Sequence, residues 1–384
     1  MENLPYDVIL LIVNECDLSS KIMLCSINKN FYKNIKIYDL MNIPKKMLIK
    51  LTNEVLLQKK FKYLRKLRVN RRINQKVINE LNLIEFDSNG NRMIKDVASM
   101  KNLKKLVIKA RSRIDQNGIR GLNLIELYVY DNNRINDVSF MKNLQILVAN
   151  DDCRIDQNGI QGLNLTELNV NNNRLIKDIS FMKSLKRLNA SGIFCAIDQN
   201  GIRGLDLIEL NINDNEKITD VAFMKNLKCL DASGFCKIDQ AGIQNLDLIE
   251  LNVHDNRYIS NVSFMTNLKI LNIRDCKVNQ MGIQGLDLIE LDAYNNHEIN
   301  DVSFMTNLKI LNAGGRFCRI GQKGIQGLDL IKLIVIYNHR INDISFMKNL
   351  KFLSITRNCH IDRKIIKNLN LTELIVDGRI DQNN

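Results

Sequence analysis

The sequence predicts an α/β solenoid, with a curved parallel sheet on its concave face and short helices or turns outside, preceded by a small all-helical segment. From about residue 81 the chain repeats every 40 to 42 residues. Leucines halfway through each period shorten the repeat to about 19 to 22 residues and give sixteen repeats. Apolar residues alternate over a short stretch of each repeat, which is typical of a strand with one buried face. One repeat alone could not bury that face, so the fold depends on stacking.

Two kinds of repeat alternate along the chain. The first kind contains Leu-x-Leu-x-x-Leu followed by an apolar residue and an asparagine, as in Leu124, Leu127, Val129 and Asn132. This pattern resembles the leucine-rich repeat, and it covers more than three quarters of the chain. The anchors of the first kind begin at Leu81, Leu122, Leu163, Leu205, Leu246, Leu286, Leu328 and Leu369, and those of the second kind at Leu64, Leu103, Leu144, Leu185, Leu227, Leu268, Leu308 and Leu350.

Two polar columns run through the repeats. The first is asparagine, whose amide has donors and acceptors for the backbone of adjacent turns, so we expect a structural role. The second is cysteine. Successive sulfurs would lie roughly 10 Å apart at two strands per step, which excludes a shared zinc ion or a disulfide and favours small buried apolar residues. The asparagines are Asn91, Asn132, Asn173, Asn215, Asn256, Asn296 and Asn338, and the cysteines are Cys153, Cys195, Cys236, Cys276, Cys318 and Cys359.

The convex side also repeats. Aspartates such as Asp115 and Asp137 directly precede short apolar stretches, so we expect helix N-caps rather than catalytic acids. The Gly118-x-x-Gly121 pattern returns in later periods and is therefore interpreted as scaffold, not as a phosphate loop. A phenylalanine column is expected to fill the core between sheet and outer turns. It consists of Phe140, Phe181, Phe223, Phe264, Phe304 and Phe346.

Residues 1–44 do not fit the repeat. No apolar run there is long enough to span a bilayer, and an acidic flank without a cleavage site argues against a secretory signal. We therefore expect an intracellular, unsecreted protein with reduced cysteines. The order Leu-Pro-x-acid-Val-Ile, then Asp-Leu, then Leu-x-Ser-x-Asn-Lys-x-Phe-Tyr resembles an F-box. Asn, Ile and Lys richness and near-identical repeats resemble the F-box/leucine-rich-repeat proteins of giant viruses of amoebae, of the mimivirus type. This second resemblance implies a location in the host cytoplasm or nucleus.

The F-box resemblance implies a substrate receptor of an SCF-type (cullin-RING) ubiquitin ligase, with the F-box docked on the adaptor subunit and the repeats holding an unknown protein target. The alternative is that these helices only cap the solenoid, as the ends of repeat arrays require. The resulting domains are 1–44, F-box-like; 45–80, basic junction and first repeat; and 81–384, solenoid. The adaptor surface implied by the resemblance consists of Leu4, Pro5, Val8, Ile9, Ile12, Leu18 and Leu24.

Alternation along the strands predicts which side chains face the concave side. One position is glutamate in most repeats of the first kind, and this acidic stripe would repel phosphate. Elsewhere on this face Asn, Asp and Ser predominate, but two apolar clusters depart from the pattern, and such clusters often mark interfaces. The early cluster includes Val107, Tyr128, Tyr130, Ile146 and Val148, and the late one, favoured as the substrate site, includes Ile334, Ile336, Tyr337, Phe352 and Ile375. Self-association through an uncapped last strand is a competing explanation for the late cluster.

The net charge of +13 is concentrated near the start of the chain. Residues 45–76 contain twelve Lys and Arg but one acid, Glu54, and residues 81–113 contain eight Lys and Arg against three acids. This basic collar could steer an acidic partner, but its confinement makes nucleic-acid binding the least favoured function. His297 and His339 lie two strands apart in one column, no nucleophile has a paired base, and no cofactor is implied, so we predict neither a metal site nor catalysis.

Overall fold

The computed structural model describes residues 20–21, 23, 36–357 and 359–380. The seven residues of the predicted adaptor surface lie outside this part of the chain. The chain divides into two compact halves, Met1–Ile176 and Lys177–Asn384, here called the N-terminal half and the C-terminal half and described separately. No helix within the described ranges is long and apolar enough to cross a membrane.

In the N-terminal half, successive strands pair in parallel, and each anchor leucine stands opposite the next. Leu40 pairs with Leu67, which pairs with Phe86, and the row continues through Leu106 and Leu127 to Leu168. The sheet therefore begins within the segment predicted to be helical. Its strands are β1 (Asp39–Leu40), β2 (Lys66–Arg68), β3 (Glu85–Asp87), β4 (Lys105–Ile108), β5 (Glu126–Tyr130), β6 (Ile146–Asn150) and β7 (Glu167–Asn169).

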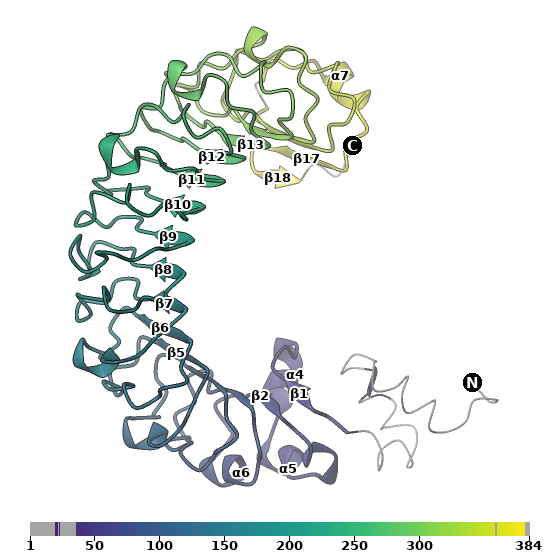
Figure 1. Cartoon of the computed structure of the whole chain (residues 1–384). Helices are drawn as coiled ribbons and strands as arrows, with labels where there is room; N and C mark the ends of the chain where they lie inside the picture. Colours follow the sequence, from purple (N-terminus) through teal and green to yellow (C-terminus); the bar gives the residue numbers. More distant parts are fainter. Residues whose placement is uncertain (1–19, 22, 24–35, 358, 381–384) are drawn as a thin grey trace, which may run out of the picture. The chain divides into compact units, whose positions relative to one another are not determined.

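The C-terminal half repeats this arrangement with the same register, as the row of neighbouring strands in Figure 1 shows. Its parallel strands are β8 (Arg187–Asn189), β9 (Glu209–Asn211), β10 (Cys229–Asp231), β11 (Glu250–Asn252), β12 (Ile270–Asn272), β13 (Glu290–Asp292), β14 (Ile310–Asn312), β15 (Lys332–Ile334), β16 (Phe352–Ile355) and β17 (Glu373–Val376). A short antiparallel strand, β18 (Arg379–Ile380), pairs with β17 through a turn at Asp377 and Gly378. The last parallel strand is thus partly covered, which weakens the case for self-association there.

The sixteen strands β2 to β17 in the described residues correspond one to one with the sixteen predicted repeats. In-register parallel strands, one from each short repeat, form the leucine-rich-repeat solenoid that the sequence predicts. The helices with defined bounds in the described residues are short, of three to six residues. They are α4 (Lys45–Lys50), α5 (Asn53–Leu56), η1 (Lys59–Phe61), α6 (Gln75–Asn79), η2 (Asn117–Ile119) and η3 (Asn158–Ile160), then η4 (Ala241–Ile243), η5 (Met281–Ile283), η6 (Lys323–Ile325) and α7 (Arg363–Lys367).

The predicted capping aspartates divide into two groups. Asp115 Oδ1 accepts the amide hydrogen of Gly118 at 3.0 Å, and Asp239 does the same for Gly242, so these carboxylates cap 3₁₀ turns. Asp137 instead accepts the amide hydrogen of Ser139, two residues on, in a turn that does not continue into a helix. The first group confirms the capping prediction. For the second group the prediction of a helix start is wrong, because the capped amide belongs to an isolated Asx turn.

The asparagine column is buried, and its side chains bond to the backbone. Asn256 donates through Nδ2 to the carbonyl oxygens of Ala232 and Ile238, and its Oδ1 accepts the amide hydrogens of Tyr258 and Ile259. One amide therefore ties two neighbouring turns together, which confirms the structural role. A glutamine ladder on the outer side, which was not predicted, works in the same way: Gln280 bonds to the backbone of Asn300 and Asp301.

The phenylalanine column does not fill the core. Phe140, Phe223, Phe264 and Phe304 are 37 to 39% exposed, and Phe181 and Phe346 are half-buried. The methionine that follows each phenylalanine occupies the core instead, with no exposed surface. The tight turn at this point directs adjacent side chains to opposite sides, and the flexible thioether fits the gap between sheet and turns. The buried residues are Met141, Met182, Met224, Met265, Met305 and Met347.

The recurrent glycines are scaffold, as predicted, and for two distinct reasons. A Cβ on Gly118, Gly159 or Gly324 would lie 2.0 to 2.1 Å from a backbone oxygen of the preceding repeat. The glycine three residues later has φ near +70 to +80°, where L residues are strained. The first glycine permits close stacking, and the second reverses the chain.

Candidate binding surface on the sheet

The open face of the sheet carries the first and third side chains of each strand, which alternate with buried residues in between. The first positions form a row across neighbouring strands in which glutamates alternate with other residues. The predicted acidic stripe is therefore interrupted. Across the N-terminal half the row is Asp39, Lys66, Glu85, Lys105, Glu126, Ile146 and Glu167, and across the C-terminal half it is Arg187, Glu209, Cys229, Glu250, Ile270, Glu290, Ile310, Lys332, Phe352 and Glu373.

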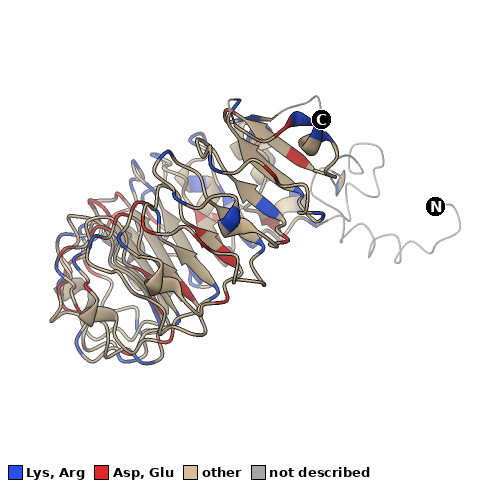
Figure 2. Ribbon diagram, turned by 90° about the horizontal axis from the view of Figure 1, so that it is seen from above, with Lys and Arg blue, Asp and Glu red and all other residues tan. Residues whose placement is uncertain are grey.

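The basic collar is partly neutralised by this alternation. Lys66 Nζ lies 2.6 Å from Glu85, and Lys105 Nζ lies 2.6 Å from Glu126. The hydrogen bond to Glu85 and its charge raise the pKa of Lys66 above the ordinary lysine value. Arg68 and Lys109 both approach Asp87 at 3.4 Å. Figure 2 shows acidic and basic residues interspersed along the strands, an arrangement that weakens long-range attraction of a polyanion.

The third positions explain why Asn and Asp predominate on this face. Asn211 Oδ1 accepts the amide hydrogen of Asn213, and Asp292 Oδ1 accepts that of Tyr294, so each side chain turns the chain at the end of its strand. These groups are engaged in structure rather than available to a partner. Where the third residue is Val107, Tyr128 or Val148, this bond is lost and strands β4, β5 and β6 run four or five residues instead of three.

The early apolar cluster lies on these longer strands. The rings of Tyr128 and Tyr130 stack with centroids 6.3 Å apart, the Tyr128 hydroxyl donates to Glu126 at 3.0 Å, and Lys105 Nζ lies 4.8 Å from the Tyr128 ring. Burial, followed by the bond to Glu126, raises the pKa of Tyr128. Val148 is only 5% exposed. The two tyrosines are half-buried, as are Val107 and Ile146, and the tyrosine rings are held by their own neighbours.

The late apolar cluster spans two rows of the open face. Ile334 and Ile375 flank the buried Ser354 in one row, and Phe352 lies in the other between Lys332 and Glu373. The Phe352 ring is 4.8 Å from Lys332 Nζ. Ile334, Ile336, Phe352 and Ile375 are half-buried, whereas Tyr337 is 45% exposed. The structure therefore places Ile334, Phe352 and Ile375 on adjacent strands, and Ile336 and Tyr337 in the turn that follows β15.

Tyr337 also breaks a backbone rule. In most repeats the turn after the strand contains one residue with positive φ, and that residue is Asp, Asn or Gly, which tolerate this conformation. Tyr337 has φ of 60° and Arg111 has φ of 70° at the corresponding turns. A bulky residue in this region is strained and persists only where its surroundings hold it, a situation common at binding sites.

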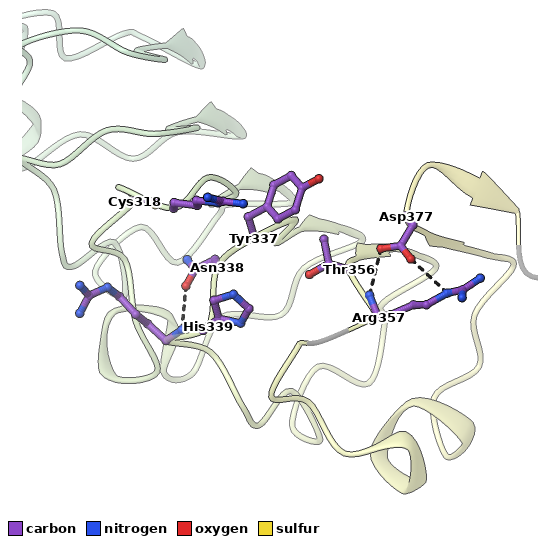
Figure 3. A pocket seen from close by; sticks show the side chains of 9 residues that line it. Cys318, Tyr337, Asn338, His339, Thr356, Arg357 and Asp377 are labelled. Carbon is purple, nitrogen blue, oxygen red and sulfur yellow. Dashed lines mark hydrogen bonds and ion pairs between the residues drawn. The ribbon is translucent and has the colours of Figure 1, made fainter.

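Each of these two strained residues lines a pocket at the ends of the strands. The Tyr337 pocket has a volume of about 690 Å³ (Figure 3). The Arg111 pocket, of about 600 Å³, is lined by four arginines and two aspartates. Neither pocket was predicted from the sequence, although an aromatic residue in a column of Asp, Asn and Gly is a signal for one of them. The Tyr337 pocket is lined by Arg316, Cys318, Tyr337, Asn338, His339, Arg340, Thr356, Arg357 and Asp377.

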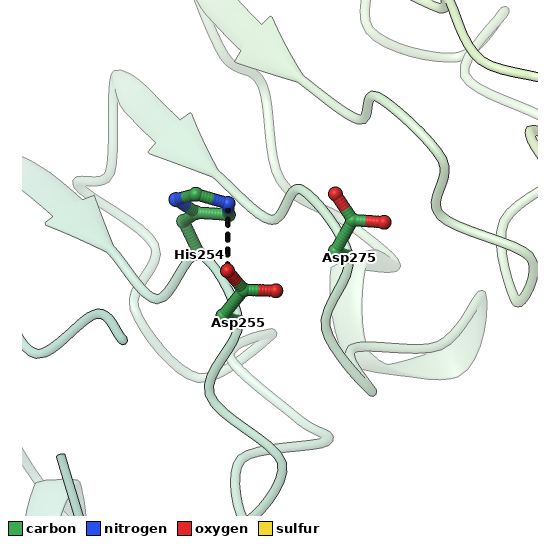
Figure 4. A group of neighbouring side chains, drawn as sticks. All are labelled: His254, Asp255 and Asp275. Atoms are coloured by element: carbon green, nitrogen blue, oxygen red, sulfur yellow. Dashed lines mark ion pairs between the residues drawn. The ribbon is translucent and has the colours of Figure 1, made fainter. Parts of the chain in front are cut away.

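A third cluster, also missed, contains His254, Asp255 and Asp275 (Figure 4). Their possible ligand atoms all lie within 4.8 Å of one another, and His254 Nε2 is 3.1 Å from an oxygen of Asp255. The residues come from the turns after two adjacent strands. The prediction of no metal site compared only the positions of histidines, so it did not consider a histidine beside two aspartates. Both carboxylates are exposed, as solvated surface acids commonly are.

The cysteine column is buried at five of its six positions, which confirms the prediction of small apolar core residues. Burial raises the pKa of Cys153 and Cys276 to about 12, and that of Cys236 and Cys318 to about 11. Thiols of such high pKa are poor nucleophiles at neutral pH. Cys359 is half-buried, and Cys229 lies outside the column on the open sheet face.

Alkaline pH is expected to destabilise the protein through these thiols. A folded-state pKa above the unfolded value of about 8.5 gives stability that is complete below pH 8.5 and is lost as pH rises toward the folded pKa. Between pH 8 and pH 10, Cys276 alone should contribute a loss of about 2 kcal/mol. Denaturant unfolding at both pH values, under reducing conditions, should show a loss smaller by that amount in Cys276→Ala. An identical pH dependence in the variant would contradict the assignment.

No protein-family model and no curated protein matches the chain. A solved internalin (inlF) from Listeria monocytogenes is 19% identical with a TM-score of 0.47, covering 79% of this chain and 89% of that chain. The functional domain of InlJ from Listeria monocytogenes, described as including a cysteine ladder, is 18% identical with a TM-score of 0.42, covering 80% of this chain and 68% of that chain.

A TLR13–ssRNA13 complex is also similar, with 17% identity, a TM-score of 0.41 and 86% of this chain covered. The match spans 52%, about half, of the TLR13 chain. The assignment of the fold rests on the strand register and repeat geometry of the chain itself.

Proposed function

We propose that the chain is a non-catalytic protein-interaction module that binds a protein partner through the late apolar cluster, here meaning Ile334, Ile336, Tyr337, Phe352 and Ile375. The observation that carries this proposal is the combination of half-exposed apolar side chains on adjacent strands with a strained tyrosine at their edge. Aromatic residues at the centre of an apolar patch commonly supply much of an interface's binding energy. Most mid-chain third positions, in contrast, use their polar side chains to turn the backbone.

The finer proposal is that the partner is a substrate for an SCF-type ubiquitin ligase, recruited by an intracellular receptor. This proposal is supported by the F-box resemblance of the segment from Leu4 to Tyr32. The resemblance of the repeats to those of giant-virus proteins supports a viral source for the protein. The competing function is a binding scaffold whose N-terminal segment only caps the solenoid. Nucleic-acid binding is disfavoured because the collar's Lys66 and Lys105 are paired with glutamates.

Adaptor binding separates the two interaction functions. Full-length protein is expected to form a stable complex with an SCF adaptor, and deletion of residues 1–35 is expected to abolish it. The deletion should stop there because Ile37 and Leu40 are core residues and β1 begins at Asp39. Absence of a complex at micromolar concentrations of the intact chain would leave only the scaffold function.

Partner binding has its own test. Proximity labelling should be compared between the intact chain and the double variant Tyr337→Ala/Phe352→Ala, with Tyr128→Ala/Tyr130→Ala as the matched aromatic control on the early cluster. We expect the labelling of partner proteins to fall at least tenfold in the late-cluster variant and to stay unchanged in the early-cluster control. Truncation of interface anchors commonly has effects of that size. Equal labelling by the intact chain and the late-cluster variant would contradict the proposed surface.

A further inference from the structure

We propose that the Tyr337 pocket binds a phosphorylated side chain of the protein partner, an inference that rests on the proposed interaction function and makes the partner a phosphoprotein. The pocket is lined by three arginines but only one acid, so with His339 neutral its net charge is +2. A phosphate monoester carries a charge of about −1.5 to −2 at pH 7. Guanidinium clusters are a recurring means of recognising such groups.

The arginines differ in how much of their charge is free. Arg357 is committed to Asp377, whose carboxylate accepts from both its Nε and its backbone amide at 3.1 Å (Figure 3). Arg316 and Arg340 have no carboxylate partner among the described residues. Arg316 instead lies over the ring of Tyr337, with 5.5 Å between the guanidinium carbon and the ring centroid. Two guanidinium groups are therefore left to meet an anion.

The positions of both free arginines are set by structural residues. Asn338, which is buried, donates to the carbonyl oxygens of Ala313 and Ile320 and accepts the backbone amide of Arg340 at 2.9 Å. Arg316 follows Gly315, whose amide donates to the carbonyl oxygen of Ile336. The strained backbone of Tyr337 places its ring beneath Arg316. The backbone at both arginines is thus fixed before binding, which reduces the entropy lost when an anion is bound.

An unused hydroxyl points to the same conclusion. Thr356 lines the pocket and is only 6% exposed, yet its Oγ1 has no hydrogen-bond partner. In Figure 3 this oxygen faces the side of the pocket occupied by His339. Leaving a buried hydroxyl unpaired costs about 1 to 3 kcal/mol, so a ligand oxygen that accepts its hydrogen bond would remove that cost. A phosphate offers three acceptor oxygens, more than a carboxylate does.

The volume of about 690 Å³ is larger than a single ion needs and leaves room for the residue that bears the phosphate. The neighbouring Phe352 and Ile375 provide apolar surface for the adjoining segment of the partner. A nucleic-acid phosphodiester carries one negative charge per phosphate, which matches the local charge of +2 less well than a monoester does.

Calorimetric titration of the full chain tests the inference with defined probes: N-acetyl phosphoserine and phosphotyrosine amides, their unphosphorylated forms, inorganic phosphate, and a single-stranded oligonucleotide. We expect at least one phosphoamino acid to bind at least tenfold more tightly than its unphosphorylated form and than inorganic phosphate. Arg340→Gln and Thr356→Val should each weaken this binding, the first by about tenfold or more. The matched control is Arg319→Gln, which removes an exposed arginine outside the pocket and should leave binding unchanged.

Equal binding of phosphorylated and unphosphorylated probes, or equal loss in Arg319→Gln, would overturn the inference. Preference for inorganic phosphate would assign the pocket to a free anion, and preference for the oligonucleotide would assign it to nucleic acid; either result rejects a phosphoprotein. Phosphatase treatment of the cell extract separates this inference from the proposed function. If partners still depend on Phe352 but not on phosphatase treatment or Arg340, the interaction function stands and the phosphate site fails. If the phosphoamino acids bind but no partner depends on Phe352, the phosphate site stands and the proposed interaction surface fails.

Discussion

Asn256→Ala is expected to lower the free energy of unfolding by about 3 to 5 kcal/mol, a large fraction of the stability of an ordinary domain. The side chain is completely buried and makes four hydrogen bonds that join adjacent repeats. Alanine would leave the amide hydrogens of Tyr258 and Ile259 without their acceptor. Chemical denaturation followed by far-ultraviolet circular dichroism measures the loss.

The control for this variant is Asn267→Ala. Asn267 is exposed, and its side chain bonds only to the exposed carboxylate of Asp247 among the contacts described. Its loss should change the stability by about 0.5 kcal/mol or less. Similar losses for the two variants would show that the buried asparagine ladder contributes little beyond a surface hydrogen bond.

Gly324→Ala is expected to destabilise the protein by about 3 kcal/mol or more, or to prevent folding of the repeat. The added Cβ would lie 2.0 Å from the carbonyl oxygen of Asn300 and 3.1 Å from Cα of Asp301. Both atoms belong to backbone, so the clash is relieved only if adjacent repeats move apart. That movement would also stretch the hydrogen bond that the amide of Val302 donates to the carbonyl oxygen of Gly324 at 2.9 Å.

Gly327→Asn provides a matched control in the same repeat. Gly327 has φ of +79°, and a Cβ there would meet nothing within 4 Å. Asn245 occupies the corresponding position of another repeat with φ of 64°. We therefore expect Gly327→Asn to cost about 1 kcal/mol or less. Comparable unfolding midpoints for Gly324→Ala and Gly327→Asn would contradict the steric explanation and leave backbone freedom as the common cause.

The repeat itself made much of the fold predictable. The spacing of leucines predicts both the number of strands and their stacking, because each repeat meets the same environment as its neighbours. An irregular repeat can therefore be assigned from the regular repeats on either side. The roles of Asn256 and Cys276 followed from the same reasoning, since a residue present at every step of a solenoid serves the stack.

Other expectations failed or were incomplete because they depended on the direction of single side chains. Phe140 and Met141 are neighbours in a tight turn, and their hydrophobicity alone does not decide which one faces the core. The acidic stripe was traced through one kind of repeat, whereas the structure inserts the residues of the other kind between its members. For the same reason the basic collar has less free positive charge than the sequence suggests, because Lys66 lies beside Glu85.

The sequence by itself determined a leucine-rich-repeat solenoid, its buried polar columns and two apolar departures from the pattern. Those features are periodic, and hydrophobic burial and backbone pairing impose them locally in every repeat. Only the tertiary structure decided that Tyr337 adopts a left-handed backbone and shares a pocket with Arg340 and Thr356. The sequence separates these residues by up to a full repeat, and in-register stacking of the strands brings them to one site.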